Sequence, residues 1–423
     1  MWPIKKFIPL ILCLSLLVGQ GTMNGFGLGH YYENQGITNA GNGLNSLVPG
    51  FQSNVSLSNP STWHHLKYTH LSLSYSGDEN TISDLPLLNR YSGLSYASWI
   101  VPIKSKGSFG LALVPYADQR ITLTGTDTSF IAFDDTLNLL NSFDRSGGIM
   151  AFKVGTSYLT RNNLSVGLSV DMLFGSSRQN ESIFFDGSSI IQTSRTRYSG
   201  VLGEVFISLA RQEKINLFAS VKQTLRGLDG IYTEKHLFDD ANRNGYHDYG
   251  NPLDFPLPDS VFAKNEIRLT GIHKPKQFSF GVQSKLNKQT SISFELSSTK
   301  DKGTISDSLT LPLDDWIDHS NDFKLSLVRF PNDISLDLVD KISFRTGLMY
   351  KSHTLAPSNA IVSEVGGSLG FGFKFKAVGN QVDLNYYLGK RNYSDIFYKT
   401  EIIQQMQVGV SLGDLWFVKR RQK

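Results

Sequence analysis

Apolar residues alternate with small or polar ones in many segments of this chain, and the segment from Gln404 to Phe417 shows the pattern most clearly. Four apolar residues share one face of it, namely Met406, Val408, Val410 and Leu412. Period-two alternation is typical of a β-strand, whose successive side chains point to opposite faces. Such a strand suits a wall with lipid on one side and a wet lumen on the other. One strand of a soluble β-sandwich gives the same pattern, so the connections between strands must decide.

The spacing and the connections favour a membrane barrel. We expect about fourteen strands, an even number as in bacterial barrels, near 66–76, 89–103, 107–124, 147–160, 163–176, 193–211, 214–234, 264–286, 289–300, 319–331, 340–353, 361–376, 380–391 and 400–417. Tight turns alternate with long loops, which are expected at 125–146, 177–192, 235–263 and 301–318. Short turns on one rim and long loops on the other are typical of outer-membrane barrels. The sequence therefore predicts an all-β fold, a transmembrane antiparallel β-barrel in the outer membrane of a Gram-negative bacterium.

The composition fits this fold. Hydrophobic residues make up 40% of the 423 residues, which suits a wall in which every second residue faces water. No apolar run long enough for a helical span, about 18 residues, follows Val18. The chain has 41 Lys and Arg against 37 Asp and Glu, and loss of Lys5 and Lys6 would leave a net charge of +2. This balance gives no sign of nucleic-acid binding.

The N-terminus has the features of a secretory signal peptide. Two lysines precede the apolar run 7–18, and small residues follow it, so cleavage is expected near Gly21, which makes 1–21 the signal peptide. A signal anchor is the alternative, although the run is short for a membrane span. The single cysteine, Cys13, lies inside this segment, and Leu12 before it is too large for a lipoprotein cleavage box. The mature chain would then contain no disulfide or cysteine metal site.

Residues 22–64 differ from the rest of the chain. They are rich in Gly, Asn and Ser, show little alternation, and carry scattered aromatic residues. We expect them to form an N-terminal plug, or hatch, in the lumen. The barrel would then span 65–418, and 419–423 would form a basic periplasmic tail.

Two kinds of lumen-facing residue bear on the plug. Charges of both signs fall on the presumed lumen faces of many strands, and we expect them to form a polar network that holds the plug: Asp171, Glu204, Glu295, Arg345, Glu364, Lys374, Lys376 and Asp383. Two segments, 366–370 and 409–413, match the Gly-x-Ser-x-Gly pattern of hydrolases. Both lie within alternating strands with no helix after them, so we interpret them as small residues that make room for the plug. No enzymatic function is predicted.

A calcium loop is one interpretation of the segment 240–251. Oxygen-bearing residues stand at positions one, three, five, seven and nine around a glycine at six, and the predicted ligands are Asp240, Asn242, Asn244, Tyr246 through its carbonyl, and Asp248. The glutamate expected at position twelve is replaced by Asn251. A polar loop without an ion has the same composition, so both interpretations stay open. No other cofactor is predicted.

Pro115 falls inside the third predicted strand. Because proline cannot donate to a β-ladder, it predicts a bulge or an inward kink in a closed barrel. A proline tolerated at the rim of the wall is the alternative.

The chain resembles the FadL/TodX family of outer-membrane transporters for long-chain fatty acids and other hydrophobic compounds. The resemblance covers about 25–421 and is carried by Asn59-Pro60-Ser61, by segments 107–116 and 163–168, and by the last hairpin with segment 408–421. Ser61 stands where the family has alanine. The resemblance implies a hatch that includes Asn59, Pro60 and Ser61. It also implies passive diffusion of fatty-acid-like molecules, with a lateral exit into the bilayer at the kinked third strand, at Pro115.

Two further functional expectations remain. An apolar segment after the third strand is a candidate surface for capture of the ligand, comprising Phe130, Ile131, Phe133, Leu137, Leu139 and Leu140. The expected partners are the hydrophobic small molecule, outer-membrane lipid, and the barrel-assembly machinery through the C-terminal strand. The alternative function is a non-transporting barrel that binds or assembles secreted or surface proteins.

Overall fold

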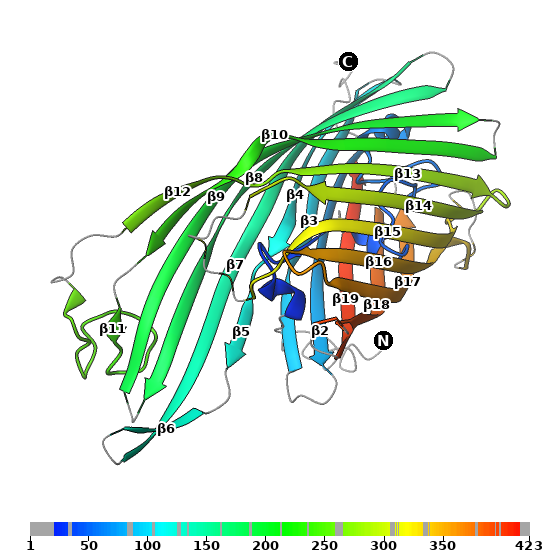
Figure 1. Cartoon of the computed structure of the whole chain (residues 1–423). Coiled ribbons are helices and arrows are strands. Elements are labelled where there is room, and N and C mark those ends of the chain that lie inside the picture. The colour runs from blue at the N-terminus through cyan, green and yellow to red at the C-terminus, as the bar shows by residue number, and fades with distance from the viewer. Residues whose placement is uncertain are drawn as a thin grey trace, which may run out of the picture.

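The computed structural model of the chain shows a β-barrel around a folded N-terminal segment (Figure 1). It describes residues 21–414 except 33–35, 83–87, 104–105, 125–127, 133–134, 161–162, 186–187, 212–213, 235–236, 259–264, 305–308, 310, 312, 333–336, 338, 377–379, 394 and 397–398. Residues 1–20 of the predicted signal peptide 1–21 and the predicted tail at 419–423 lie outside the described residues, as does the aromatic end of the last strand after Asp414. Among the described residues, no helix is long and apolar enough to cross a membrane.

The wall is a closed antiparallel barrel of fourteen strands. The strand segments are β2 (Thr69–Ile82), β3 (Leu88–Ile103), β4 (Gly107–Asp118), β5 (Ile121–Thr124), β6 (Thr128–Ala132), β7 (Asp135–Leu159), β8 (Leu164–Phe185), β9 (Ser188–Arg211), β10 (Ile215–Glu234), β11 (Phe238–Asp239), β12 (Asn265–His273), β13 (Pro275–Lys285), β14 (Thr290–Asp301), β15 (Trp316–Arg329), β16 (Ile342–Ala356), β17 (Ile361–Lys376), β18 (Asn380–Asn392) and β19 (Thr400–Asp414). Segments β4 and β5 both pair with β7, and β12 and β13 both pair with β10, so each couple forms one interrupted strand. The short segments β6 and β11 pair with the ends of β7 and β9 and are not counted among the fourteen. The barrel closes where β19 pairs with β2, from Asp414↔Thr69 to Glu401↔Ile82.

The two faces of the wall have the polarity of a membrane barrel, not of a soluble sandwich. In β19, Val410 and Leu412 point outward and are exposed, while Gln407 and Ser411 face the lumen and are buried. The outward faces of β2 and β17 are likewise apolar, with Leu71, Leu73, Leu369, Phe371 and Phe373 among the exposed residues. In these strands every second residue therefore presents an apolar side chain to the outside of the barrel, as the alternation predicted.

Two of the predicted long loops were wrong. Segments 125–146 and 177–192 are occupied mainly by strands, because β7, β8 and β9 continue well past the predicted strand ends. In Figure 1 the strands β7 to β10 project from the barrel toward β6 and β11. Where β8 and β9 continue, both faces carry polar residues: Gln179 pairs with Ser194 on one face, and Asn180 pairs with Thr193 on the other. The apolar half of the alternation is therefore absent, and the period-two signal fails.

The predicted strand 264–286 is split in the structure. It breaks at Lys274, between β12 and β13, where Gly271 has φ of +63° and Pro275 begins the second part. Opposite this break, β10 has register shifts between Thr224 and Asp229. Proline and a left-handed glycine within four residues cannot continue a regular ladder, which explains the break.

The N-terminal segment fills the lumen as a plug. It contains η3 (Thr22–Gly25), β1 (His30–Tyr31), α2 (Ile37–Ala40) and η4 (Pro60–His65). Its side chains are largely buried, and they contact strands on opposite sides of the barrel, from β3, β4, β7, β8 and β9 for η4 to β17, β18 and β19 for α2. The predicted fold, a barrel with an N-terminal plug, is therefore present.

Candidate functional site: a plugged lumen with an unpaired wall segment

Buried hydrogen bonds fasten the plug to the barrel at several heights. Glu295 of β14 accepts the backbone N–H groups of Ser46 and Leu47, the latter at 2.8 Å. On β16, two strands further along the wall, Arg345 donates through Nε to the carbonyl of Gly50 at 2.8 Å. Each contact joins a polar group of the plug backbone to a charged lumen-facing side chain, so removal of the plug would cost Glu295 and Arg345 these hydrogen bonds.

The hatch residues Asn59, Pro60 and Ser61 form the N-terminal turn of η4. The side chain of Asn59 accepts the N–H of Ser61 at 3.1 Å, and its amide donates to the carbonyl of Leu47 at 2.8 Å. The hydroxyls of Ser61 and of Ser208 in the wall share a short hydrogen bond, in which either one can be the donor. The serine that replaces the family's alanine thus adds a contact between hatch and barrel.

Glycines in the wall make room for the plug. A Cβ atom at Gly167 would lie 2.4 Å from the backbone nitrogen of Ser61, and one at Gly347 would lie 2.3 Å from that of Gly43. The two segments with a hydrolase-like pattern belong to this group: Ser368 accepts the N–H of Gly43 at 2.7 Å, and Gly409 lies against Ile37. Their small residues accommodate the plug, as predicted.

The predicted lumen charges form ion pairs. Lys153 lies 3.1 Å from Asp171, Lys222 lies 3.2 Å from Glu204, and Lys324 lies 3.8 Å from Glu295. On the opposite wall Arg345 pairs with Asp383 at 2.7 Å and Arg391 with Glu364 at 2.7 Å. Lys374 is buried, and the side chain of Lys376 lies outside the described residues. The result is a charged, cross-linked zone at the level of the plug.

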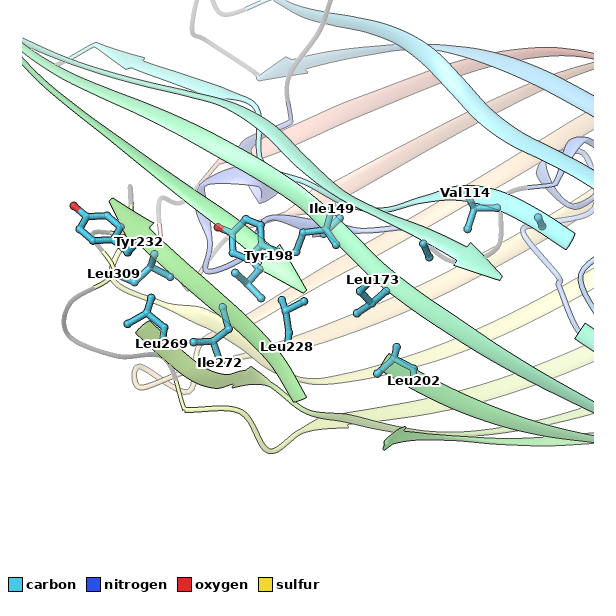
Figure 2. Close-up of a cluster of buried hydrophobic side chains, with 14 of the residues drawn as sticks. Val114, Ile149, Leu173, Tyr198, Leu202, Leu228, Tyr232, Leu269, Ile272 and Leu309 are labelled. Carbon is cyan, nitrogen blue, oxygen red and sulfur yellow. The ribbon is translucent and has the colours of Figure 1, made fainter. Parts of the chain in front are cut away.

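An apolar cluster begins directly beyond that charged zone (Figure 2). It contains Leu28, Tyr96, Ala112, Val114, Ala117, Ile149, Ala151, Leu173, Tyr198, Leu202, Leu228, Tyr232, Leu269, Ile272 and Leu309. On β8 the lumen-facing position after Asp171 is Leu173, and on β9 the one beyond Glu204 is Leu202. The lumen therefore changes from charged to apolar within one lumen-facing row on the side of the barrel that carries the projecting strands.

The wall loses one of its ladders where this apolar cluster meets β4. The pairing of β3 with β4 ends at Ala97↔Leu113, and the next residues on each strand, Tyr96 and Val114, both belong to the apolar cluster. Beyond Leu113, β4 stays paired with β7 on its other edge, with a register shift between Pro115 and Ala117. The predicted irregularity at Pro115 is thus present, and it accompanies an unpaired stretch between neighbouring wall strands.

The plug occupies the edge of β4 that β3 leaves. Strand β1 pairs with β4 through His30↔Asp118 and Tyr31↔Ala117, and the N–H of Tyr32 donates to the carbonyl of Tyr116 at 2.9 Å. An exposed strand edge offers unpaired donors and acceptors. Here the hatch satisfies them from inside the barrel.

A polar junction that the sequence analysis missed joins the two interruptions of the wall. His273, at the end of β12, contacts Asp301 through Nδ1 at 2.5 Å and the hydroxyl of Tyr116 through Nε2 at 2.7 Å. Its ring also stacks on that of Tyr31 in the plug, with centroids 4.9 Å apart. Pro275, two residues after a histidine inside a predicted strand, was the signal available in the sequence. The junction links the kink in β4, the β12–β13 break and the plug.

The predicted capture residues do not lie beside Pro115. Phe130 and Ile131 are on β6 and Leu137 is on β7, and these strands form a hairpin at the far end of the projecting strands (Figure 1). Leu139 and Leu140, both partly buried, pair with Phe185 and Phe184 of β8, whereas Phe133 lies outside the described residues. This apolar segment is therefore separated from the unpaired wall segment.

The predicted calcium loop is compact. Asp240 accepts the N–H groups of Asn244 and Gly245 at 3.2 and 2.8 Å, and Gly245 has φ of +76°, as expected for the sharp turn. Hydrogen bonds, first from the side chain of Asn244, lower the pKa of the Asp248 carboxyl, so it is ionised at neutral pH. No three carboxylates, imidazoles or thiols gather as a metal site in the described part of the chain. Of the five predicted calcium ligands, two are carboxylates, two are side-chain amides and one is a backbone carbonyl.

Removal of Arg345 is expected to destabilise the barrel and release the plug locally. Both Arg345 and Asp383 are fully buried, so Arg345→Met leaves an unpaired carboxylate and should lower the free energy of unfolding by about 3–5 kcal/mol. The double variant Arg345→Met/Asp383→Leu should recover most of that loss, because it removes both charges. Urea unfolding of the three proteins in detergent measures the difference. A double variant as unstable as the single one would contradict a stabilising role for this ion pair.

Comparison with known proteins gives one matching family model and several solved structures with a similar fold. A family model described as BamG matches residues 4–423. No curated protein sequence matches the chain significantly. Similar solved structures include the CymD monoaromatic hydrocarbon channel, with a TM-score of 0.58 and 13% identity over 94% of this chain and 100% of that one.

Two further structures have the same fold. A FadL homologue of Pseudomonas aeruginosa has a TM-score of 0.56 and 13% identity, with coverage of 92% of this chain and 99% of that one. The toluene transporter TbuX of Ralstonia pickettii has a TM-score of 0.52 and 14% identity, with coverage of 90% and 98%. At these identities the likeness shows a shared fold. The resemblance to the FadL/TodX family is thus confirmed for the fold, whereas the matching family model is a different one.

Proposed function

The chain belongs to the BamG family, and we propose that it is an outer-membrane barrel of a Gram-negative bacterium that passes small hydrophobic molecules by passive diffusion, without an enzymatic step. The observation that carries this proposal is the apolar cluster that leads to the unpaired segment between β3 and β4. Support also comes from the fold, which the chain shares with a monoaromatic hydrocarbon channel and a toluene transporter.

The proposed path avoids the charged zone. A molecule that enters among Tyr198, Leu202 and Leu228 would meet the ion pairs of Asp171 and Glu204 if it continued along the barrel axis. Transfer of an apolar molecule into such a polar zone is unfavourable. Between Tyr96 and Val114 the wall has no ladder to cross, so we propose a lateral exit into the bilayer beside Pro115.

Fatty-acid-like compounds are the proposed substrates. An apolar tail would lie in the cluster, and the polar junction around His273 and Tyr116 would lie close to its polar end. The segment with Phe130, Ile131, Phe133, Leu137, Leu139 and Leu140 is proposed as a capture surface for molecules outside the cell. Uptake of a labelled apolar probe into proteoliposomes tests this function.

A second candidate function is a role in barrel assembly, in which the protein binds other outer-membrane or surface proteins. The family name favours it, since Bam denotes the barrel-assembly machinery. The buried bonds between plug and wall are compatible with it, because they keep the lumen closed. If uptake is absent and the central barrel of that machinery co-purifies with the protein at native expression levels, this second function replaces the first.

We also propose that the loop 240–251 binds calcium weakly. Without a glutamate at position twelve, the affinity is expected in the range of roughly 10⁻⁴–10⁻³ M. Asp240→Ala should abolish binding in a calcium titration of the whole protein, whereas Asp340→Ala, a carboxylate that pairs with Arg329 elsewhere, should leave the curve unchanged. Identical titration curves for the wild type and Asp240→Ala would dismiss the site.

A further inference from the structure

The outward face of β8 locates the outer edge of the membrane. Between Leu164 and Phe174 every outward-facing residue is apolar, and Leu168, Met172 and Phe174 are strongly exposed. Ten residue steps of about 3.4 Å, tilted by about 40°, cover about 25 Å, which is the height of the apolar band of an outer-membrane barrel. Because β8 begins at the short periplasmic turn, Phe174 marks the outer boundary of the hydrocarbon layer.

A group of arginines lies immediately beyond this boundary, on the same outward face. Phe174 pairs with Ser199, and the next two outward rows bring Arg197 opposite Ser176 and Arg195 opposite Arg178. These rows lie where the headgroups of the outer leaflet meet the protein.

The arginines have few protein partners. Like charges directly opposite each other in an antiparallel pair are destabilising, yet Arg178 and Arg195 form such a pair. Arg195 donates to the hydroxyl of Ser176 at 3.5 Å. Arg178 donates to the carbonyl of Gly245 at 3.4 Å, and its guanidinium lies over the ring of Tyr246, 4.9 Å from the centroid. Arg197 approaches Glu266 at 3.6 Å, and both side chains are more than half exposed. Among the described residues the group of three arginines therefore has one carboxylate within ion-pair distance, that of Glu266, which lies near Arg197.

The arginines surround a hollow that has hydroxyl donors as well. This basic hollow has a volume of about 370 Å³ and is lined by Arg178, Thr193, Ser194, Arg195, Arg197, Thr233 and Glu266. Guanidinium groups bind phosphate through paired N–H groups, and hydroxyls add single hydrogen bonds. The unbalanced charge, the donors and the height in the membrane all suit a phosphate group held at the outer headgroup level.

We propose that the basic hollow binds the phosphate of the phosphorylated glycolipid of the outer leaflet, a molecule of the lipid A class. The sugar-phosphate headgroup would lie in the hollow, and its acyl chains would run down the apolar face of β8 past Phe174. This site is on the outside of the barrel. It rests on the proposed outer-membrane location and is independent of transport through the lumen.

The test compares binding of purified lipid A to the wild type and to the triple variant Arg178→Gln/Arg195→Gln/Arg197→Gln in detergent. The expected loss of affinity for lipid A is at least about tenfold, because three phosphate contacts are removed. Lys288→Gln, which changes an exposed lysine in a periplasmic turn, is the matched control and should bind as the wild type does. Resistance of the barrel to unfolding by SDS below the boiling point shows that each variant is folded.

Two further probes identify the ligand. Dephosphorylated lipid A should bind the wild type no better than phosphorylated lipid A binds the triple variant. Inorganic phosphate should bind more weakly than lipid A, because it lacks the acyl chains. Equal affinity of a folded triple variant and the wild type for lipid A would overturn the proposal. So would equal affinity of the wild type for lipid A and inorganic phosphate, which would indicate a site for free anions.

Discussion

Deletion of residues 25–57 is expected to raise the single-channel conductance from a closed level to that of a water-filled pore. The deleted residues include α2 and the backbone groups that Glu295, Arg345 and Ser368 hold. The wall closes through its own ladder from β19 to β2, so the deletion removes the pairing of β1 with the edge of β4 but none of the pairings between wall strands. The freed lumen-facing charges would then be hydrated, and water and ions would fill the space.

Planar-bilayer recordings measure this effect. A deletion in the loop 242–250, which follows β11 at the end of the projecting strands (Figure 1), should keep the conductance at the closed level and serves as the control. If the plug deletion gives a folded barrel that is still closed, the plug does not determine the permeability of the lumen.

Pro115→Val is expected to slow the uptake of an apolar probe several-fold while the barrel remains folded. The valine restores a backbone N–H at the position where β4 leaves the ladder with β3, so pairing can extend past Leu113 and narrow the proposed exit. The matched control is Pro102→Val. Pro102 lies on β3 within the intact part of the same ladder, opposite Ser108, so its replacement should not change uptake.

Stopped-flow uptake by proteoliposomes gives the rates for both proline variants. Unchanged uptake in a folded Pro115→Val barrel would rule out this exit. If Pro102→Val slowed uptake as much as Pro115→Val, the slower uptake would reflect a general stiffening of the wall and not a local change at the proposed exit.

The membrane-spanning part of the fold could be predicted from the sequence because one face of each strand must be apolar. The segments 361–376 and 380–391 match β17 and β18 within one residue. The extensions of β8 and β9 beyond the bilayer could not be predicted, because no lipid imposes a pattern on residues such as Gln179 and Thr193. Backbone hydrogen bonds to the neighbouring strands hold these extensions together. Such bonds do not depend on the polarity of the side chains, so the periodicity of the sequence does not reveal them.

The site was predictable in part. Pro115 indicated the interrupted strand. Proline lacks a backbone N–H wherever it stands, so this interruption can be predicted from one residue without knowledge of its neighbours in space. Asn59, Pro60 and Ser61 lie at the start of η4 in the plug, and their role as a hatch stays a prediction. The junction of His273, Asp301 and Tyr116 was missed, because it depends on residues far apart in the sequence that meet only when the barrel closes. Pro275 indicated a break in the same way as Pro115, and His273, two residues before it, is the residue that joins the two interruptions.

The most direct measurement of the proposed function is the uptake of a labelled long-chain fatty acid into liposomes that contain the wild-type protein. Protein-free liposomes and liposomes with the Pro115→Val variant are the references, and conductance is recorded on the same preparation. Passage through a plugged barrel with a lateral exit predicts protein-dependent uptake that exceeds both references while the ionic conductance stays at the closed level. Uptake no faster than in protein-free liposomes, with the protein shown to be folded, would contradict the proposal that this barrel passes hydrophobic molecules.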